Sequence, residues 1–332
     1  GTGQSNWFNA IFEYRIGGLR ALSTTGGNTF VGLQAGQNTT GPENVFVGRW
    51  SGLSTTAGAG NTFVGTFSGQ TNTGSDNTFM GRSAGMANTT AGNNSFFGAE
   101  AGRFNTSGFR NAFFGHRAGL NNTTAISNSF FGSSAGAATT EGSFNSFFGR
   151  QAGEANVDGI ANSFFGYLAG RSNFNGDNNA FFGESAGEGN TIGIGNAFFG
   201  KAAGHSNITG NRNSALGIGA NVGASNLSDA TAIGAGAIVT ASSRIQLGRN
   251  GQDTVSIGAL AAATATNLCI NGTVLAACSS SARYKENVRP FDTGFGIIRD
   301  LRPVRFDWIG RDEPDLEKLD QDDAEPDQVD LD

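Results

Sequence analysis

Residues 94–102 read N-S-F-F-G-A-E-A-G, and variants of this nine-residue motif occur twelve times along the chain, once every 16 or 17 residues. Its consensus is N-x-F-[FVM]-G-x-x-[AS]-G, and it decays only in the last copy. The opening residues are Asn28, Asn44, Asn61, Asn77, Asn94, Asn111, Asn128, Asn145, Asn162, Asn179, Asn196 and Asn213. A period this regular predicts stacked structural units rather than a folded-back globule. We number the repeat positions from this asparagine, which is position 1.

Each repeat has the character of one coil of an all-β solenoid. Its five-residue core favours a short strand, and the glycines at positions 5 and 9 break the chain twice per unit. Helical repeats are longer and would not tolerate 53 glycines in 332 residues. With 28 phenylalanines, the chain does not have the composition of a disordered glycine-rich segment. No stretch reaches the roughly 20 apolar residues of a membrane helix, so we expect no membrane insertion.

Eighteen phenylalanines occupy positions 3 and 4, and they form the candidate core and subunit-interface ladders. Neighbouring side chains on a strand point to opposite faces, so both faces of this strand require burial. A single coil has one interior, and the other ladder must therefore pack on something else, most economically an identical chain. The ladders comprise Phe30, Phe46, Phe63, Phe79, Phe96, Phe113, Phe130, Phe147, Phe164, Phe181 and Phe198, and Phe97, Phe114, Phe131, Phe148, Phe165, Phe182 and Phe199.

The unit changes after Asn213. The phrases A-L-G-I-G-A (215–220), T-A-I-G-A-G-A (231–237), I-Q-L-G (245–248) and V-S-I-G (255–258) have smaller apolar residues and shorter spacing. This stretch resembles the head repeats of trimeric autotransporter adhesins, which form left-handed β-rolls of three wound chains. The resemblance, joined to the two-faced ladder, implies a homotrimer.

A second motif lies near the C-terminus, where residues 280–291 read S-S-A-R-Y-K-E-N-V-R-P-F and residues 301–308 read L-R-P-V-R-F-D-W. It resembles the start of the intramolecular chaperone domain that ends phage tailspikes and tail fibres, including endosialidases. The residues in place are Ser280, Ser281, Arg283, Lys285, Asn287, Val288, Leu301, Pro303, Phe306 and Trp308. Such domains assist trimer assembly and then cut themselves off before the motif serine, which implies cleavage between Ser279 and Ser280.

The residues of this motif are chemically able to support self-cleavage. Ser280 would be the nucleophile and Lys285 its base, provided that burial keeps the lysine neutral, with Arg283 in a supporting role. The alternative is a noncleaving linker, because the glycine- and glutamate-rich stretch and the coiled coil of the family domain are not recognisable. At most, then, the chain is a single-turnover serine peptidase acting on itself.

Cys269 and Cys278 flank Asn271-Gly272, a hairpin signal. Symmetric pairing about this turn opposes Cys269 to Val274, so an intrachain disulfide needs a bulge or slip. An interchain disulfide in a trimer and two unpaired thiols are the other possibilities, and an oxidised pair would suit an extracellular protein.

Charge is concentrated at the C-terminus. Residues 311–332 carry eleven acids against Arg311 and Lys318, a balance of −9 in a chain of net charge −6, which leaves +3 for the remainder. A solvated acidic tail is expected there, and the rest lacks the clustered basic face of a nucleic-acid-binding protein. His116 and His205 have no Cys or carboxylate at metal-ligand spacing. We expect neither a metal nor a cofactor.

Asn and Thr crowd the variable part of each repeat. The structural interpretation is that they stack and satisfy backbone groups at the corners of the coils. The functional alternative is a regular hydroxyl and amide array that binds glycans or ice.

The expected organisation is an N-terminal cap or junction (1–27), the solenoid (28–212), adhesin-head-like coils (213–258), a hairpin linker with two cysteines (259–279), a chaperone-like segment (280–310) and the acidic tail (311–332). We expect a homotrimeric extracellular fibre segment, of a bacterial surface, a secreted fibre or a virion, that serves reach and attachment. Its partners would be itself, also end to end, and a surface glycan or receptor. The alternative is a polysaccharide-binding or depolymerising tailspike with sites between subunits, although no constant repeat position carries a carboxylate.

Overall fold

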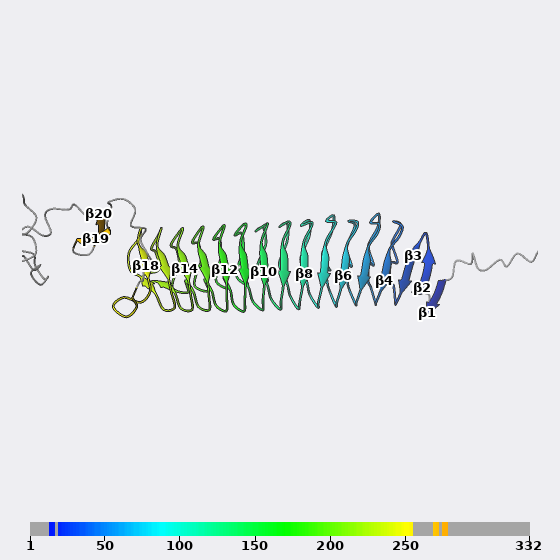
Figure 1. Ribbon diagram of the computed structural model, residues 1–332. Coiled ribbons are helices and arrows are strands. Elements are labelled where there is room, and N and C mark those ends of the chain that lie inside the picture. The colour runs from blue at the N-terminus through cyan, green and yellow to red at the C-terminus, as the bar shows by residue number, and fades with distance from the viewer. Residues whose placement is uncertain (1–12, 17–18, 255–267, 272–273, 278–332) are drawn as a thin grey trace, which may run out of the picture. The chain divides into compact units, whose positions relative to one another are not determined.

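The computed structural model describes residues 13–16, 19–254, 268–271 and 274–277. Residues 28–254 form a parallel β-solenoid with one coil per repeat, which confirms the all-β solenoid expected from the sequence (Figure 1). The parallel strands are β3 (Asn28–Val31), β4 (Val45–Val47), β5 (Thr62–Val64), β6 (Thr78–Met80), β7 (Ser95–Phe97), β8 (Ala112–Phe114), β9 (Ser129–Phe131), β10 (Ser146–Phe148), β11 (Ser163–Phe165), β12 (Ala180–Phe182), β13 (Ala197–Phe199), β14 (Ser214–Leu216), β16 (Thr231–Ile233) and β18 (Ile245–Leu247).

Both ends of this sheet depart from the 17-residue pattern. At the N-terminal end, β1 (Glu13–Ile16) pairs antiparallel with β2 (Leu19–Thr25), and β2 pairs antiparallel with β3. At the other end, β15 (Asn221–Val222) and β17 (Ile238–Val239) form a second, two-stranded parallel sheet. The antiparallel strands fit the cap or junction expected for residues 1–27, which stays a prediction, and residues 1–12 and 17–18 lie outside the described residues.

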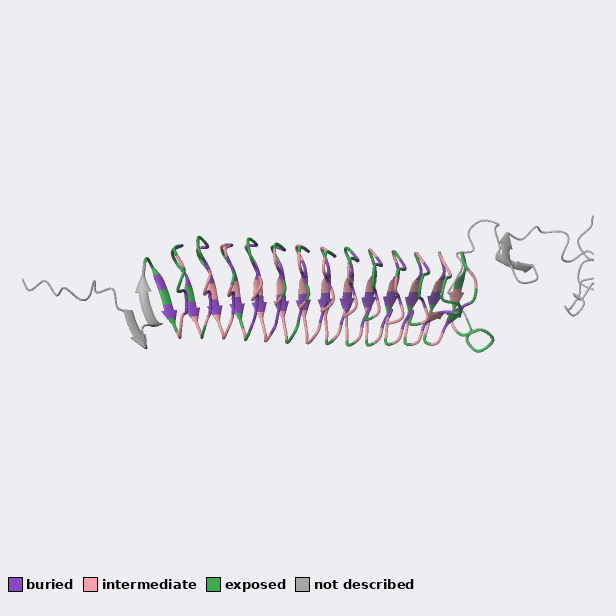
Figure 2. Cartoon of the chain, turned by 180° about the vertical axis from the view of Figure 1, so that it is seen from behind, coloured by how far each residue is buried: buried purple, intermediate pink, exposed green. Residues whose placement is uncertain are grey.

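The interior is built around the position-3 phenylalanines. Every one of them from Phe30 to Phe198 is at most 1% exposed, as is every alanine at position 8 from Ala35 to Ala220 (Figure 2). Consecutive rings stack at centroid distances of 4.7–5.1 Å. This spacing equals the 4.7–4.9 Å between paired strands, so the rungs of the core follow the hydrogen-bonded rungs of the sheet.

The two repeated glycines have separate steric causes. Gly98, at position 5, has φ +140°, and a Cβ there would lie 2.4 Å from the carbonyl oxygen of Gly115 in the next coil. Gly102, at position 9, has φ +56°, and its Cβ would lie 2.5 Å from the ring of Phe96. The first glycine lets adjacent coils approach closely, and the second makes room for the core ring.

Asparagine side chains fill the rest of the interior. At position 1, Asn94 accepts the backbone N–H of Asn111 at 2.9 Å and donates its amide to the carbonyl of Gly108 at 2.9 Å. At position 12, Asn105 donates to the same carbonyl at 2.9 Å and to Oδ1 of Asn88 at 2.5 Å. All of these asparagines are buried. Their amides therefore satisfy backbone groups between coils, in agreement with the structural interpretation of the asparagines.

The hairpin formed by β19 (Leu268–Asn271) and β20 (Val274–Ala277) differs from expectation in its register. Asn271 pairs with Val274 and Cys269 pairs with Ala276, so the expected opposition of Cys269 to Val274 is wrong. Residues 272–273, rather than Asn271-Gly272, separate the two strands, and they lie outside the described residues. Cys278 lies outside the described residues.

Candidate functional site: an outer apolar ladder

The position-4 side chains form a second ladder on the outer face of the same strands. All fourteen are apolar, and we call them the outer ladder. They are Val31, Val47, Val64, Met80, Phe97, Phe114, Phe131, Phe148, Phe165, Phe182, Phe199, Leu216, Ile233 and Leu247. Val47, Val64 and the phenylalanines from Phe97 to Phe182 are part-exposed, and the other rungs are exposed, from 39% at Ile233 to 54% at Leu216. The single chain thus leaves an uninterrupted apolar stripe about 60 Å long half open.

The seven phenylalanines of the outer ladder are ordered as a stack. Their six successive ring pairs have centroid distances of 4.6–4.9 Å and interplanar angles of 3–6°. Strand pairing is in register throughout, so Phe148 lies beside Phe131 and Phe165. The stack is therefore a straight and regular ridge, prearranged for contact with an equally regular surface.

The two flanks of this ridge differ in chemistry. Position 2, on the same face two residues earlier, carries only Ser or Ala beside each phenylalanine of the ridge, and these side chains are part-buried. Position 6, on the other flank, carries mostly larger side chains in this stretch, including Arg150, Glu184 and Lys201, whereas Ala99 and Ser133 are small. Lys201 Nζ lies 3.0 Å from Glu184 Oε2, and both side chains are about half exposed. One flank of the stripe is therefore lined by small side chains at position 2, and the other by mostly larger side chains at position 6.

The structure divides the eighteen sequence-selected phenylalanines into two sets. Eleven lie inside the chain, and the seven from Phe97 to Phe199 lie on its outer face. Sequence reasoning selected both sets together, and its pattern N-x-F-[FVM]-G also included the aliphatic residues at position 4. It missed the row of small residues at position 2. The alternation of strand side chains was the signal that could have found them, because positions 2 and 4 share one face.

A charge cluster lies beside the first rungs of the ridge. The side chain of Glu100 is 8% exposed and contacts Arg82 at 2.9 Å and Arg117 at 3.0 Å, in the coils on either side. Arg103 lies 3.8 Å away. The hydrogen bond from Arg117 is the main cause that lowers the pKa of Glu100, burial opposes it, and Arg82 adds to it. This carboxylate joins three coils and is ionised at neutral pH.

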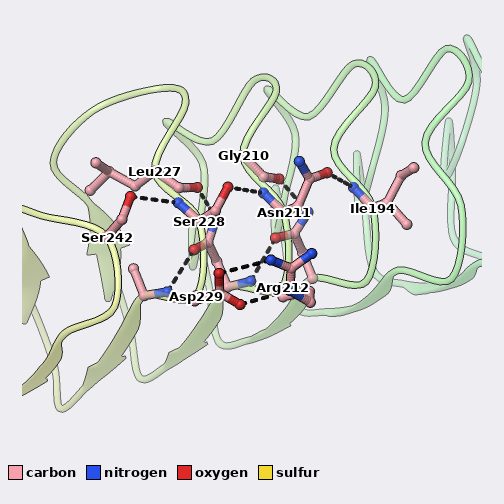
Figure 3. Close-up of polar contacts among 11 residues, drawn as sticks. Ile194, Gly210, Asn211, Arg212, Leu227, Ser228, Asp229 and Ser242 are labelled. Carbon is pink, nitrogen blue, oxygen red and sulfur yellow. Dashed lines mark hydrogen bonds and ion pairs between the residues drawn. The ribbon is translucent and has the colours of Figure 1, made fainter.

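Polar side chains at positions 16 and 17 also bind across coils (Figure 3). Asn211 Oδ1 accepts the backbone N–H of Ile194 at 2.8 Å, and Ser228 Oγ accepts that of Asn211 at 3.2 Å. Arg212 donates two hydrogen bonds to Asp229, at 2.7 and 2.8 Å, and this lowers the pKa of the Asp229 carboxyl. These hydrogen bonds and this ion pair link adjacent coils.

The described residues show no group of three or more His, Cys, Asp or Glu side chains placed to hold a metal ion. His205 Nδ1 lies 3.2 Å from Ser206 Oγ and 3.1 Å from Asn221 Nδ2, a local polar contact. In the part of the chain that the structure describes, no helix is long and apolar enough to cross a bilayer.

The sequence-predicted catalytic residues Ser280, Arg283 and Lys285 lie outside the described residues. Their arrangement in space is therefore a prediction of the motif alone.

Comparison with known proteins identifies this C-terminal segment. Residues 280–325 match the family model described as the chaperone of endosialidase, a match that begins at the motif serine and extends into the acidic stretch. Searches among curated proteins and among solved structures found no match. The chain thus joins a β-solenoid of 17-residue repeats to a segment similar to the chaperone of endosialidase, a combination that fits a structural protein of the tail-fibre or tailspike kind.

Proposed function

We propose that this protein is the shaft of a homotrimeric fibre, assembled with the help of its C-terminal segment and located outside the cell or on a virion. The observation that carries the proposal is the outer ladder, fourteen apolar rungs in register on one face. A continuous exposed apolar stripe marks an interaction surface. The chaperone-like match supports assembly as a trimer, because that is the role its family resemblance implies.

The energy available to such an interface is large. Burying an exposed Phe side chain contributes roughly 1.5–3 kcal/mol, and rungs that are already half buried contribute about 1 kcal/mol each. Fourteen rungs per chain then give on the order of 10 kcal/mol before the entropy of association is counted. Because association costs ~4–15 kcal/mol in lost translational and rotational freedom, the outer ladder is of the size needed to be the main stabilising part of the interface.

The test compares outer-ladder variants with exposed phenylalanines elsewhere. Phe131→Asp combined with Phe148→Asp places two charges in the ridge and should abolish the trimer in native mass spectrometry, with insoluble chain as the main product. Phe144→Asp combined with Phe174→Asp is the matched control, because these side chains are 58% and 50% exposed and lie off the ladder. The control should remain trimeric. A wild-type chain that is monomeric, or a ridge variant that stays trimeric, would contradict the proposal.

Self-cleavage at Ser279–Ser280 is the second part of the proposal, carried by the match that starts at Ser280. Lys285, as a neutral amine, would take the proton of Ser280 Oγ while that oxygen attacks the carbonyl carbon of Ser279. The peptide C–N bond breaks, the proton passes to the nitrogen of Ser280, and water hydrolyses the ester. Arg283 would support the geometry of the site.

Intact-mass measurement tests this step. The wild-type protein should yield a fibre chain ending at Ser279 and a separate C-terminal piece. Ser280→Ala and Lys285→Ala should each block the cut while the fibre stays trimeric, because the outer ladder does not involve them. A wild-type chain that remains whole to Asp332 after trimerisation would show that Ser280 and Lys285 do not cleave the chain.

No observation favours substrate turnover or glycan binding specifically. Some corner carboxylates are bound within the chain itself: Asp177 accepts the backbone N–H of Ile160 at 2.8 Å, and Asp158 accepts the hydroxyl of Thr140 at 3.1 Å. Attachment to a receptor, and joining of fibres end to end, follow from the fibre architecture as expectations only.

A further inference from the structure

The residues at positions 2 and 4 vary in size in opposite directions along the solenoid. Where position 4 is Phe, position 2 is always small: Ser95, Ala112, Ser129, Ser146, Ser163, Ala180 and Ala197. Where position 4 is Val, Met, Leu or Ile, position 2 is β-branched in six of seven coils: Thr29, Val45, Thr62, Thr78, Thr231 and Ile245, with Ser214 as the exception. The coils with the largest side chains at position 4 are thus the coils with the smallest side chains at position 2.

Both rows are straight and lie on one face. The strands pair in register, so Ser129, Ser146 and Ser163 follow one another along the sheet, as do Phe131, Phe148 and Phe165. Two residues along a strand separate the rows by about 7 Å. Beside the ridge therefore runs a parallel row of serine and alanine, which we call the trough because its side chains are small, and position 6 lies on the other flank.

From this relationship we propose that each chain seats its ridge, Phe97 to Phe199, in the position-2 trough of a second copy of itself, with the chains parallel and in register. The inference rests on the proposed oligomer and specifies its packing. Its support is the match in size: the trough is deep only in the coils where the ridge is tall, which is the condition for copies at the same height to interlock.

Symmetry makes the direction of the chains part of the proposal. Copies related by an axis parallel to the solenoid can each place the ridge in a neighbour's trough, as a two-fold pair or as a closed ring of three. Antiparallel copies related by a two-fold axis across the stripe place ridge against ridge and trough against trough. Only the parallel arrangement uses the complementarity, and it also places the C-terminal ends of all the solenoids on one side.

The charged flank agrees with an approach from the position-2 side. Glu184 and Lys201 pair with each other along the chain and stay about half exposed, so these two position-6 charges are paired without a partner subunit. An alternative explanation for the small residues lies within one chain: a position-4 phenylalanine ring that lies over position 2 of its own strand also requires a small side chain there. The experiment below distinguishes this alternative from packing between chains.

Disulfide trapping distinguishes these arrangements in the full-length chain. In a background with Cys269→Ser and Cys278→Ser, the double variant Ser146→Cys, Phe148→Cys should form covalent trimers on a nonreducing denaturing gel. Each single variant should remain monomeric on that gel, because like positions do not meet. Within one strand, residues two apart are about 7 Å apart at Cα, near the limit for a disulfide, and an intrachain bond would not change the chain's mass on the gel.

The register has its own control. Ser146→Cys with Phe114→Cys moves the ridge cysteine two coils, about 10 Å, and should not cross-link. Equal cross-linking of this pair would overturn the register, and cross-linking of Phe148→Cys alone would overturn the ridge-in-trough packing. A native trimer without cross-linking in the 146/148 pair would reject this packing but keep the proposed function, whereas a native monomer would reject both.

Side-chain exchange supplies a second readout. Ser146→Phe alone fills the trough and Phe148→Ser alone removes a rung, so each should lower the dissociation temperature of the trimer. The double exchange Ser146→Phe, Phe148→Ser moves ridge and trough together in every copy and should restore most of the loss. Additive losses in the double variant would contradict the proposal.

Discussion

The side-chain amide of Asn173 donates a hydrogen bond to Oδ1 of Asn156 in the preceding coil, over 2.8 Å. The same bond links Asn190 to Asn173 and Asn207 to Asn190, so the position-12 asparagines form a hydrogen-bonded ladder through the interior. The ladder breaks at Thr139. There, Thr139 Oγ1 and Asn122 Oδ1 are buried and find no hydrogen-bond partner among the described residues.

Thr139→Asn should repair this break and stabilise the solenoid by about 1 kcal/mol. The new amide can donate to Asn122 Oδ1, and its oxygen can accept from the amide of Asn156. Asparagine and threonine have similar volumes, so the interior need not expand. The measurement is the midpoint of denaturant unfolding.

Ala138→Asn is the control for this prediction, because it introduces the same residue one position away, on the outer side of the chain. It should leave the midpoint unchanged. A Thr139→Asn variant no more stable than Ala138→Asn would show that the unpaired groups at this coil cost little.

Gly102→Ala should destabilise the solenoid by about 2–3 kcal/mol, because its Cβ meets the Phe96 ring and its φ is +56°. Gly219→Ala separates the two causes. Gly219 has φ +65°, but a Cβ there has no atom within 4 Å. This variant should lose only about 1 kcal/mol, the cost of the left-handed conformation. Equal losses in thermal unfolding would mean that the ring moves aside freely.

The adjacent pair Phe147 and Phe148 should respond in different assays. Phe147 is 0% exposed, so Phe147→Ala should lower the free energy of unfolding by about 3–5 kcal/mol whatever the oligomeric state. Phe148→Ala should affect mainly the dissociation of the trimer, because its ring lies on the part-exposed outer face. Circular dichroism and native mass spectrometry of both variants provide the comparison. Similar profiles for the two would contradict the division into inner and outer ladders.

Glu100 should make stability depend on pH in the acid range. Its pKa is lower in the folded than in the unfolded chain, so the folded state binds fewer protons. Its contribution is fully present above the unfolded pKa of about 4.3 and is lost as the pH falls through the folded pKa. Glu100→Gln removes the charge and keeps the shape.

The measurement is thermal unfolding of wild type and Glu100→Gln from about pH 6 to pH 3. The advantage of the wild type over the variant should be largest at the upper end and shrink as the solution is acidified. A constant difference across this range would show that the arginines do not stabilise the ionised carboxylate.

The repeat period by itself determined one strand and one coil per unit, because a 17-residue repeat with two fixed glycines is too short for a helical repeat unit and is broken twice by the glycines. Strand alternation likewise determined that positions 3 and 4 face opposite ways. It did not determine which of them faces inward, since both are apolar. The tertiary structure decided this: the turn at Gly98, with φ +140°, directs the chain so that Asn94, Phe96 and Ala101 share the interior. The sequence likewise predicted that asparagines stack and satisfy backbone groups, but it did not determine that those at position 12 are buried. An asparagine is satisfied in the interior only when an adjacent coil, stacked one strand spacing away, presents a carbonyl or amide oxygen to it.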